Sequence, residues 1–167
     1  GFEYVQDEMN NVIIYKPATP GYENAPTVIL QGHMDMVCEK RPDVQHDFEK
    51  DGLNLSVKDG YVTANGTTLG GDDGIAVAYA LALLDSTDLP HPALEVLITV
   101  DEEIGLLGAV GLDCSVLKGK RMINMDSEAE GSLWISCAGG LSAVSHIPVA
   151  RVDAEGEKLQ IKVCGLM

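Results

Sequence analysis

The chain has 167 residues, of which 46% are hydrophobic, 22% are charged and only 5% are aromatic, and this composition predicts about one globular domain with an aliphatic core. Its 26 acidic residues outnumber its 11 lysines and arginines, and the net charge of −15 argues against nucleic acid and anionic membranes as partners, because both bind basic patches. No apolar stretch of the sequence approaches the roughly 20 residues that a membrane-spanning helix requires.

Two strands and a hairpin are predicted in the first third of the chain. Residues 11–15 and 27–32 are apolar, β-branched runs that are typical of strands. Residues 53–57 and 61–64 flank the turn Lys58-Asp59-Gly60, and this pattern predicts a β-hairpin.

Residues 73–84 give the clearest helical pattern, with acids at the N-terminal end. This segment is apolar nearly all round, which predicts a helix sandwiched inside a large core. Further strands are expected at 94–100, 121–125 and 132–136, with a short helix or turn at 104–110.

The last part of the chain shows alternating polar and apolar residues, which predicts two more strands at 143–149 and 158–163. Strands that alternate with helices favour an α/β fold, a mixed sheet flanked by helices. We expect the chain to change domain near residue 141, with residues 1–140 in one domain and residues 141–167 in the next.

Four apolar or small-residue stretches end in side chains that can bind a metal ion: His33, Asp72, the pair Glu102-Glu103, and Asp126. Three acids in a row after a buried strand are costly unless something neutralises them, and a cation would do so. In α/β sheets, ligands bind beyond the carboxyl ends of the strands. The pattern therefore predicts a two-metal hydrolase site.

Each motif alone also has an ordinary structural explanation: a loop histidine, an acidic helix cap, a solvated strand end or a turn-forming aspartate. One site would explain all four motifs together. Histidine, aspartate and glutamate ligands without cysteine match zinc, with manganese or cobalt as alternatives. Asp35 lies two residues after His33 and can orient its ring, and one acid of the Glu102-Glu103 pair can act as a general base.

The four cysteines are widely spaced and form no Cys-x-x-Cys pair, which argues against a disulfide framework or a zinc knuckle. Cys114 and Cys137 are expected to be buried thiols in a reducing compartment, so a cytoplasmic location is predicted.

The ordered motifs resemble those of the co-catalytic di-zinc peptidases of the aminoacylase and carboxypeptidase clan. The similarity is greatest to the bacterial aminoacyl-histidine (Xaa-His) dipeptidases, and it runs through Gln31-Gly32-His33-Met34-Asp35, Gly70-Gly71-Asp72-Asp73-Gly74, Asp101-Glu102-Glu103-Ile104-Gly105 and Asn124-Met125-Asp126-Ser127.

The resemblance implies a role for each motif residue. His33 and Asp126 correspond to terminal ligands of one zinc ion, Asp72 to the carboxylate that bridges both ions, and Glu103 to a ligand of the other. The family also implies a cis peptide bond between Asp72 and Asp73.

Two further residues are assigned by the same resemblance. Asp35 corresponds to the acid that orients the metal-bound histidine, and Glu102 to the general base that takes a proton from water. Gly74 stands where related tripeptidases often have lysine, which favours the histidyl-dipeptidase branch.

The resemblance implies that residues 1–140 form the N-terminal part of a zinc-peptidase-like catalytic domain and that residues 141–167 begin an α+β lid or dimerisation domain. It also places a last zinc ligand, a histidine, beyond residue 167, together with the residues of the lid domain that bind substrate. We therefore expect a piece of a longer protein that is inactive alone, and a whole enzyme that is a homodimer acting on short peptides, with Xaa-His dipeptides as substrates. Two alternatives stay open: a deacylase of the same clan that acts on N-acyl amino acids, and a non-catalytic relic with an incomplete metal site.

Overall fold

The computed structural model describes residues 1–127, 129–141, 143–150, 152–153, 155–157 and 159–162. The contacts divide the chain into two units, Gly1–Glu130 and Gly131–Met167, and every helix and strand assigned among the described residues lies in the first. That the second unit begins a lid domain stays a prediction. Among the described residues, no helix is both long and apolar enough to cross a membrane.

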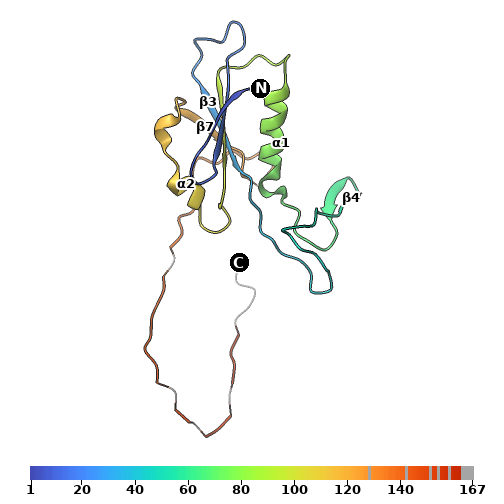
Figure 1. The fold of residues 1–167 in the computed structure, drawn as a ribbon, viewed down its shortest axis with the longest axis vertical. Coiled ribbons are helices and arrows are strands. Elements are labelled where there is room, and N and C mark those ends of the chain that lie inside the picture. The colour runs from blue at the N-terminus through green and yellow to red at the C-terminus, as the bar shows by residue number, and fades with distance from the viewer. Residues whose placement is uncertain (128, 142, 151, 154, 158, 163–167) are drawn as a thin grey trace. The chain divides into compact units, whose positions relative to one another are not determined.

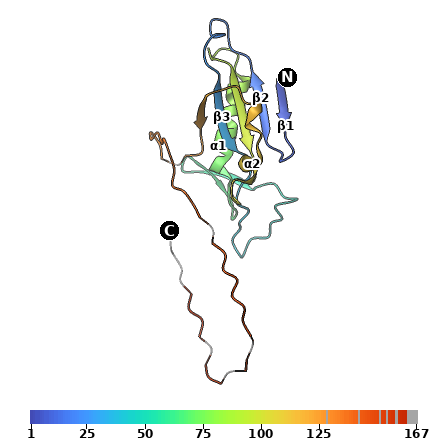
Figure 2. The ribbon, with the colours of Figure 1, turned by 90° about the vertical axis from the view of Figure 1, so that its left-hand side faces the viewer.

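A five-stranded mixed sheet forms the centre of the first unit (Figures 1 and 2). The strand order is β1 (Glu3–Gln6), β2 (Val12–Lys16), β6 (Leu94–Thr99), β3 (Val28–His33) and β7 (Arg121–Asn124). The β1–β2 and β2–β6 pairs are antiparallel, whereas β6, β3 and β7 run parallel. The carboxyl ends of these three parallel strands therefore meet at one edge of the sheet.

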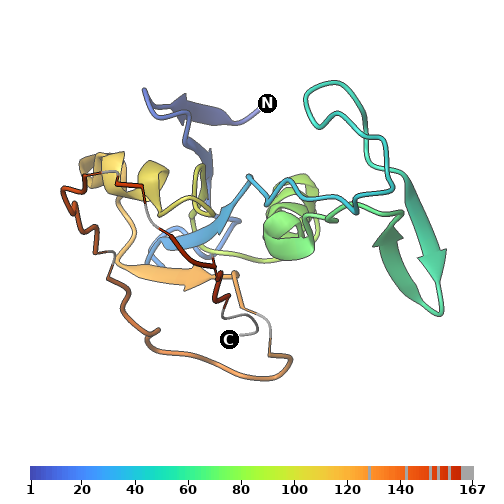
Figure 3. The same cartoon turned by 90° about the horizontal axis from the view of Figure 1, so that it is seen from below.

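The two faces of the sheet are covered unequally. Helix α1 (Gly71–Asp85) lies against one face, where Leu30, Val96 and Ile98 pack with Ala80 and Leu84. The opposite face holds Ile13, Ile29 and Leu97, which contact the segment around the 3₁₀ turn Cys114–Val116 that follows α2 (Leu107–Gly111). Figure 3 shows α1 and α2 on opposite sides of the sheet.

The predicted hairpin is present as β4 (Leu55–Lys58) and β5 (Tyr61–Ala64), which pair only with each other and project away from the sheet in Figure 1. The predicted helix and the strands now seen as β2, β3, β6 and β7 are likewise confirmed within one or two residues at most ends.

Several expectations are wrong. The apolar helix is not sandwiched: Ala76, Ala80 and Leu84 are buried, but Ile75 and Tyr79 are more than half exposed. The structure buries only the stripe that faces the sheet.

The strands predicted at 132–136 and 143–149 are absent from the described residues, and residues 159–162 form no strand, while Lys158 and Val163 lie outside the described residues. An alternating pattern becomes a strand only when a partner strand supplies hydrogen bonds, and no paired strand is assigned to this part of the described chain. Cys114 and Cys137, expected to be buried, are both exposed.

Candidate metal centre

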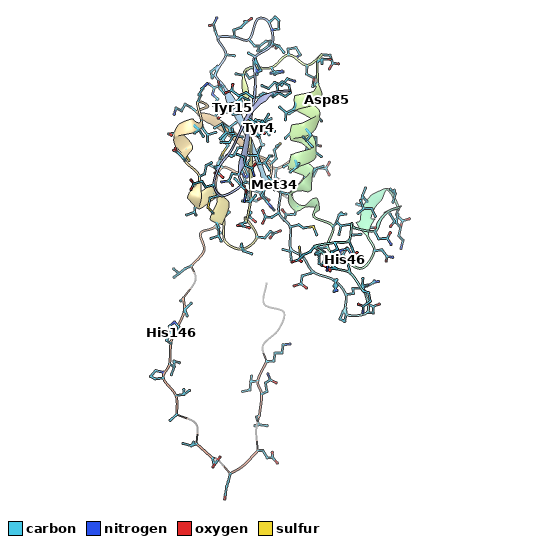
Figure 4. All side chains as sticks on the ribbon, viewed as in Figure 1. Tyr4, Tyr15, Met34, His46, Asp85 and His146 are labelled. Carbon is cyan, nitrogen blue, oxygen red and sulfur yellow. The ribbon has the colours of Figure 1, made fainter. Side chains whose placement is uncertain are left out.

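The topology brings all four metal-competent motifs to one edge of the sheet. β3 ends at His33, β7 is followed by Asp126, and β6 leads into the loop that carries Glu102 and Glu103. Asp72 and Asp73 lie at the start of α1, and both contact His33, so the N-terminal end of this helix reaches the same edge. Met34, which directly follows His33, marks this edge in Figure 4, and Asp85 marks the opposite end of α1.

His33 stands at the centre of the group and is only 1% exposed. Its Nε2 atom lies 3.1 Å from Asp72 Oδ1, 3.8 Å from Glu102 Oε2 and 3.9 Å from Asp126 Oδ2. Two sets of possible ligands result, His33 with Glu102 and Asp126, and His33 with Asp72 and Glu103; within each set the ligand atoms all lie within 4.8 Å of one another.

The structure thus brings together the four predicted ligands and the predicted base. It also places Glu102 as close to His33 as Asp126 is, so the geometry makes Glu102 a possible ligand as well as a possible base. The individual roles of these residues stay predictions.

Asp35 fixes the other side of the imidazole ring. His33 Nδ1 lies 3.0 Å from the Asp35 backbone oxygen and 3.3 Å from Asp35 Oδ1. With the ring proton on Nδ1, the Nε2 atom keeps a lone pair that faces the carboxylates of the group. Asp35 Oδ2 also accepts a hydrogen bond from the Glu103 backbone N–H at 3.2 Å, which ties the Glu102-Glu103 loop to β3.

The electrostatics of the group reflect a surplus of negative charge. Burial would lower the pKa of His33, but the carboxylate of Asp72 and the charges of Asp126, Asp35 and Glu102 outweigh it, and the pKa is raised. Burial raises the pKa of Glu102, and repulsion from neighbouring carboxylates adds to this effect, against the opposing influence of His33.

Asp35 shows the opposite behaviour. Burial would raise its pKa, but the backbone N–H groups of Glu102 and Glu103 hydrogen-bond to it and hold the pKa below its ordinary value.

The residues fit a divalent cation. A lone pair on a buried imidazole that faces several carboxylate oxygens is unfavourable unless a proton or a cation lies between them. Nitrogen and carboxylate oxygen donors without sulfur suit zinc or manganese in a hydrolytic centre.

Asp73 is a further residue of the site, and its position before the helix indicates an acidic helix cap. It is 1% exposed and its Oδ2 atom accepts a hydrogen bond from the His33 backbone N–H at 3.2 Å. Its carboxylate also accepts from the backbone of Ala76 in the first turn of α1. Because Asp73 serves the helix start, its neighbour Asp72 is left to face His33, and the peptide bond between the two is cis, as the resemblance implies.

Comparisons with known proteins show the family of the chain. Residues 29–135 match the model of peptidase family M20/M25/M40. The chain is 44% identical over 168 residues to the cytosol non-specific dipeptidase of Escherichia coli K12, which covers 99% of this chain and 35% of that protein. The chain thus spans about a third of the length of this curated relative.

Two solved structures are similar as well. An aminoacylhistidine dipeptidase from Vibrio alginolyticus superposes with a TM-score of 0.75 and 49% identity, covering 78% of this chain and 26% of that one. Aminopeptidase PepT from Bacillus cereus gives a TM-score of 0.60 and 32% identity, covering 76% and 34% of the two chains. Peptidases of the matched family depend on a metal ion, usually zinc. The chain belongs to peptidase family M20/M25/M40.

Proposed function

We propose that the protein containing this chain is a two-metal dipeptidase that acts on Xaa-His dipeptides in the cytoplasm. The observation that carries the proposal is the convergence of one buried histidine with carboxylates from three other segments at the carboxyl edge of the sheet. The names of the Escherichia coli and Vibrio relatives support dipeptides as the substrate class.

In this proposal, His33 and Asp126 would hold one ion, Glu103 would hold the other, and Asp72 would supply a carboxylate to both. Bound zinc ions would polarise the scissile carbonyl and lower the pKa of the attacking water. Asp35 keeps the Nδ1 proton of His33 in place, so that Nε2 stays available as a ligand atom.

Glu102 would move the proton. Its carboxylate lies 3.8 Å from His33 Nε2, beside the proposed ions, where it can remove a proton from water. The same carboxyl group can then deliver that proton to the leaving amine nitrogen, so that Glu102 is again an ionised carboxylate at the end of the cycle.

The test uses the natural polypeptide that contains this chain. The protein is stripped of metal with a chelator, reloaded with zinc, manganese or cobalt, and assayed against Xaa-His dipeptides, other dipeptides and N-acyl amino acids. We expect activity to vanish on chelation and to return on reloading, with dipeptides preferred. Full activity in the chelated protein would refute the metal site, and hydrolysis of N-acyl amino acids alone would show a deacylase.

We further propose that the whole enzyme is a homodimer and that this chain alone is inactive. The support for both is the resemblance described above. Light scattering of the natural polypeptide, and an assay of the isolated 167 residues, test them separately.

A further inference from the structure

The loop that carries Glu102 and Glu103 is closed at its base by a residue far away in the sequence. Asn11, which precedes β2, is completely buried. Its Nδ2 atom donates to the Gly108 backbone oxygen at 2.9 Å and to Asp7 Oδ2 at 2.7 Å, and its Oδ1 atom accepts from the Val100 backbone N–H at 3.2 Å. One short side chain therefore binds the residue before the loop, Val100, and the residue after its last turn, Gly108.

These hydrogen bonds join the two ends of the loop. The Gly108 backbone N–H donates to the Val100 oxygen at 3.1 Å, so Asn11 bridges the remaining donor of Val100 and the remaining acceptor of Gly108. The amide side chain of asparagine carries its donor and its acceptor on two separate atoms, which suits two partners on opposite sides. Aspartate has no donor for Gly108, and alanine has neither group.

The loop needs such a base because its backbone is unfavourable. Asp101 and Leu106 have φ angles of 54° and 61°, the left-handed region that residues with side chains rarely adopt. Gly105 has a φ of 121°. This conformation turns Glu102 and Glu103 toward His33, and it persists only if the surrounding structure holds it.

The surroundings leave little room for change at the loop base. A Cβ atom at Gly108 would collide with the Val100 carbonyl oxygen and would lie 2.6 Å from Asn11 Oδ1. The Asn11 side chain and the backbones of Val100 and Gly108 are thus in tight contact, so a displacement of one of these residues displaces the other two.

We propose that Asn11 is a positioning residue of the metal centre, which sets the placement of Glu102 and Glu103 by clamping the base of their loop. Asn11 contacts neither glutamate and acts through Val100 and Gly108. The inference rests on the proposed function only for its metal-binding consequence; the clamping itself is independent of it.

The experiment compares Asn11→Ala with a matched control in the natural polypeptide. Glu95 is 2% exposed and also accepts backbone hydrogen bonds, from Lys118 and Gly119, but it lies near the opposite end of β6. Glu95→Ala therefore removes a similar buried clamp without touching the site. Hydrogen exchange of the amides at 103–108 and the affinity for zinc are measured in both variants.

In Asn11→Ala we expect the loop amides to exchange at least about tenfold faster and zinc to bind about 10- to 100-fold more weakly, the range for residues that support metal ligands. In Glu95→Ala we expect both quantities to stay near wild type. In the turnover assay of Asn11→Ala, kcat should fall while KM changes less, because a displaced Glu102 affects the proton transfer.

Unchanged loop exchange in Asn11→Ala would overturn the proposal, and so would equal losses of metal affinity in Asn11→Ala and Glu95→Ala. If Asn11→Ala does not fold, Asn11→Asp keeps the size of the side chain and the acceptor for Val100 but has no donor for Gly108, and it should give the same exchange pattern. If the wild-type protein binds no zinc, the proposed function fails, while the exchange experiment still tests the clamp.

Discussion

Glu102→Gln separates the two roles that the geometry allows for this residue. Glutamine keeps the size of the side chain but cannot accept a proton from water. If Glu102 is the base, the variant should retain its metal ions and lose activity by a factor of about 10² to 10⁴, the usual contribution of a general base. That loss corresponds to roughly 3 to 5 kcal/mol of transition-state stabilisation, at about 1.36 kcal/mol per tenfold change in rate.

A second expectation follows from the metal-free state. The pKa of Glu102 is raised by burial and by the neighbouring carboxylates, so its ionisation costs stability as the pH rises through its pKa in the unfolded chain. Glutamine carries no charge at any pH. The metal-free Glu102→Gln protein should therefore have a higher melting temperature than the metal-free wild type at neutral pH.

The assay combines elemental analysis, turnover of an Xaa-His dipeptide and thermal unfolding, with Glu103→Gln as the matched control. Glu103→Gln should lose metal. If Glu102→Gln loses metal to the same degree, Glu102 is a ligand, as its set with His33 and Asp126 permits. If Glu102→Gln turns over at nearly the wild-type rate, the assignment of the base is wrong.

Three further outcomes are expected. Asp72→Ala should lose both ions, since its carboxylate is proposed to contact each, and two equivalents of metal by elemental analysis would contradict that role. Gly32→Ala should destabilise the protein by about 1–3 kcal/mol in thermal unfolding, because the new methyl group would lie 2.5 Å from Asp73 Oδ2. Gly74→Ala is the control and should not destabilise the protein, because its methyl group would meet nothing within 4 Å. Zinc affinity, measured by calorimetry over a pH series, should fall as the pH drops through the pKa of His33, which is raised above the ordinary 6.5, because zinc must displace a proton from this ring; a zinc affinity that does not change with pH would show that His33 is not a ligand. In the metal-free protein, the stability due to protonated His33 is fully present below about pH 6.5 and is lost as the pH rises through the raised pKa.

The meeting of the motifs could be predicted because the strands that position them are continuous apolar runs. β3 and β6 are buried along nearly their whole lengths, and such runs identify strands of a covered sheet. Once these strands are parallel, His33 and the end of β6 must lie at the same edge. The glycines before Asp72 similarly indicate a sharp entry into the helix.

The directions of Glu102 and Glu103 could not be predicted by the same means. In an extended strand, neighbouring side chains point to opposite faces. The chain leaves the extended conformation at Asp101, whose φ is 54°, and both glutamates then reach the vicinity of His33. The period-two rule fails here because the strand has already ended, and no sequence pattern marks a left-handed aspartate.

Weak patterns fail for a different reason. β1 is exposed along its length and lies at the sheet edge, so little burial distinguishes it in the sequence from a loop. Residues 143–149 show clear alternation yet form no strand, because a strand needs a partner that the sequence pattern does not specify. Local patterns therefore located the strands with buried neighbours and misjudged those whose state depends on pairing.

Neighbouring carboxylates contribute to the raised pKa values of both His33 and Glu102, and burial is the larger cause for Glu102. Five carboxylates, those of Asp35, Asp72, Glu102, Glu103 and Asp126, lie around one buried imidazole, and the metal-free site holds protons more tightly to reduce their repulsion. Divalent cations would relieve the same repulsion and release those protons, so metal binding must stabilise the folded chain by mass action and must do so more strongly at higher pH. The acidic residues that make this edge unfavourable for folding alone are thus the ones that give it affinity for a cation.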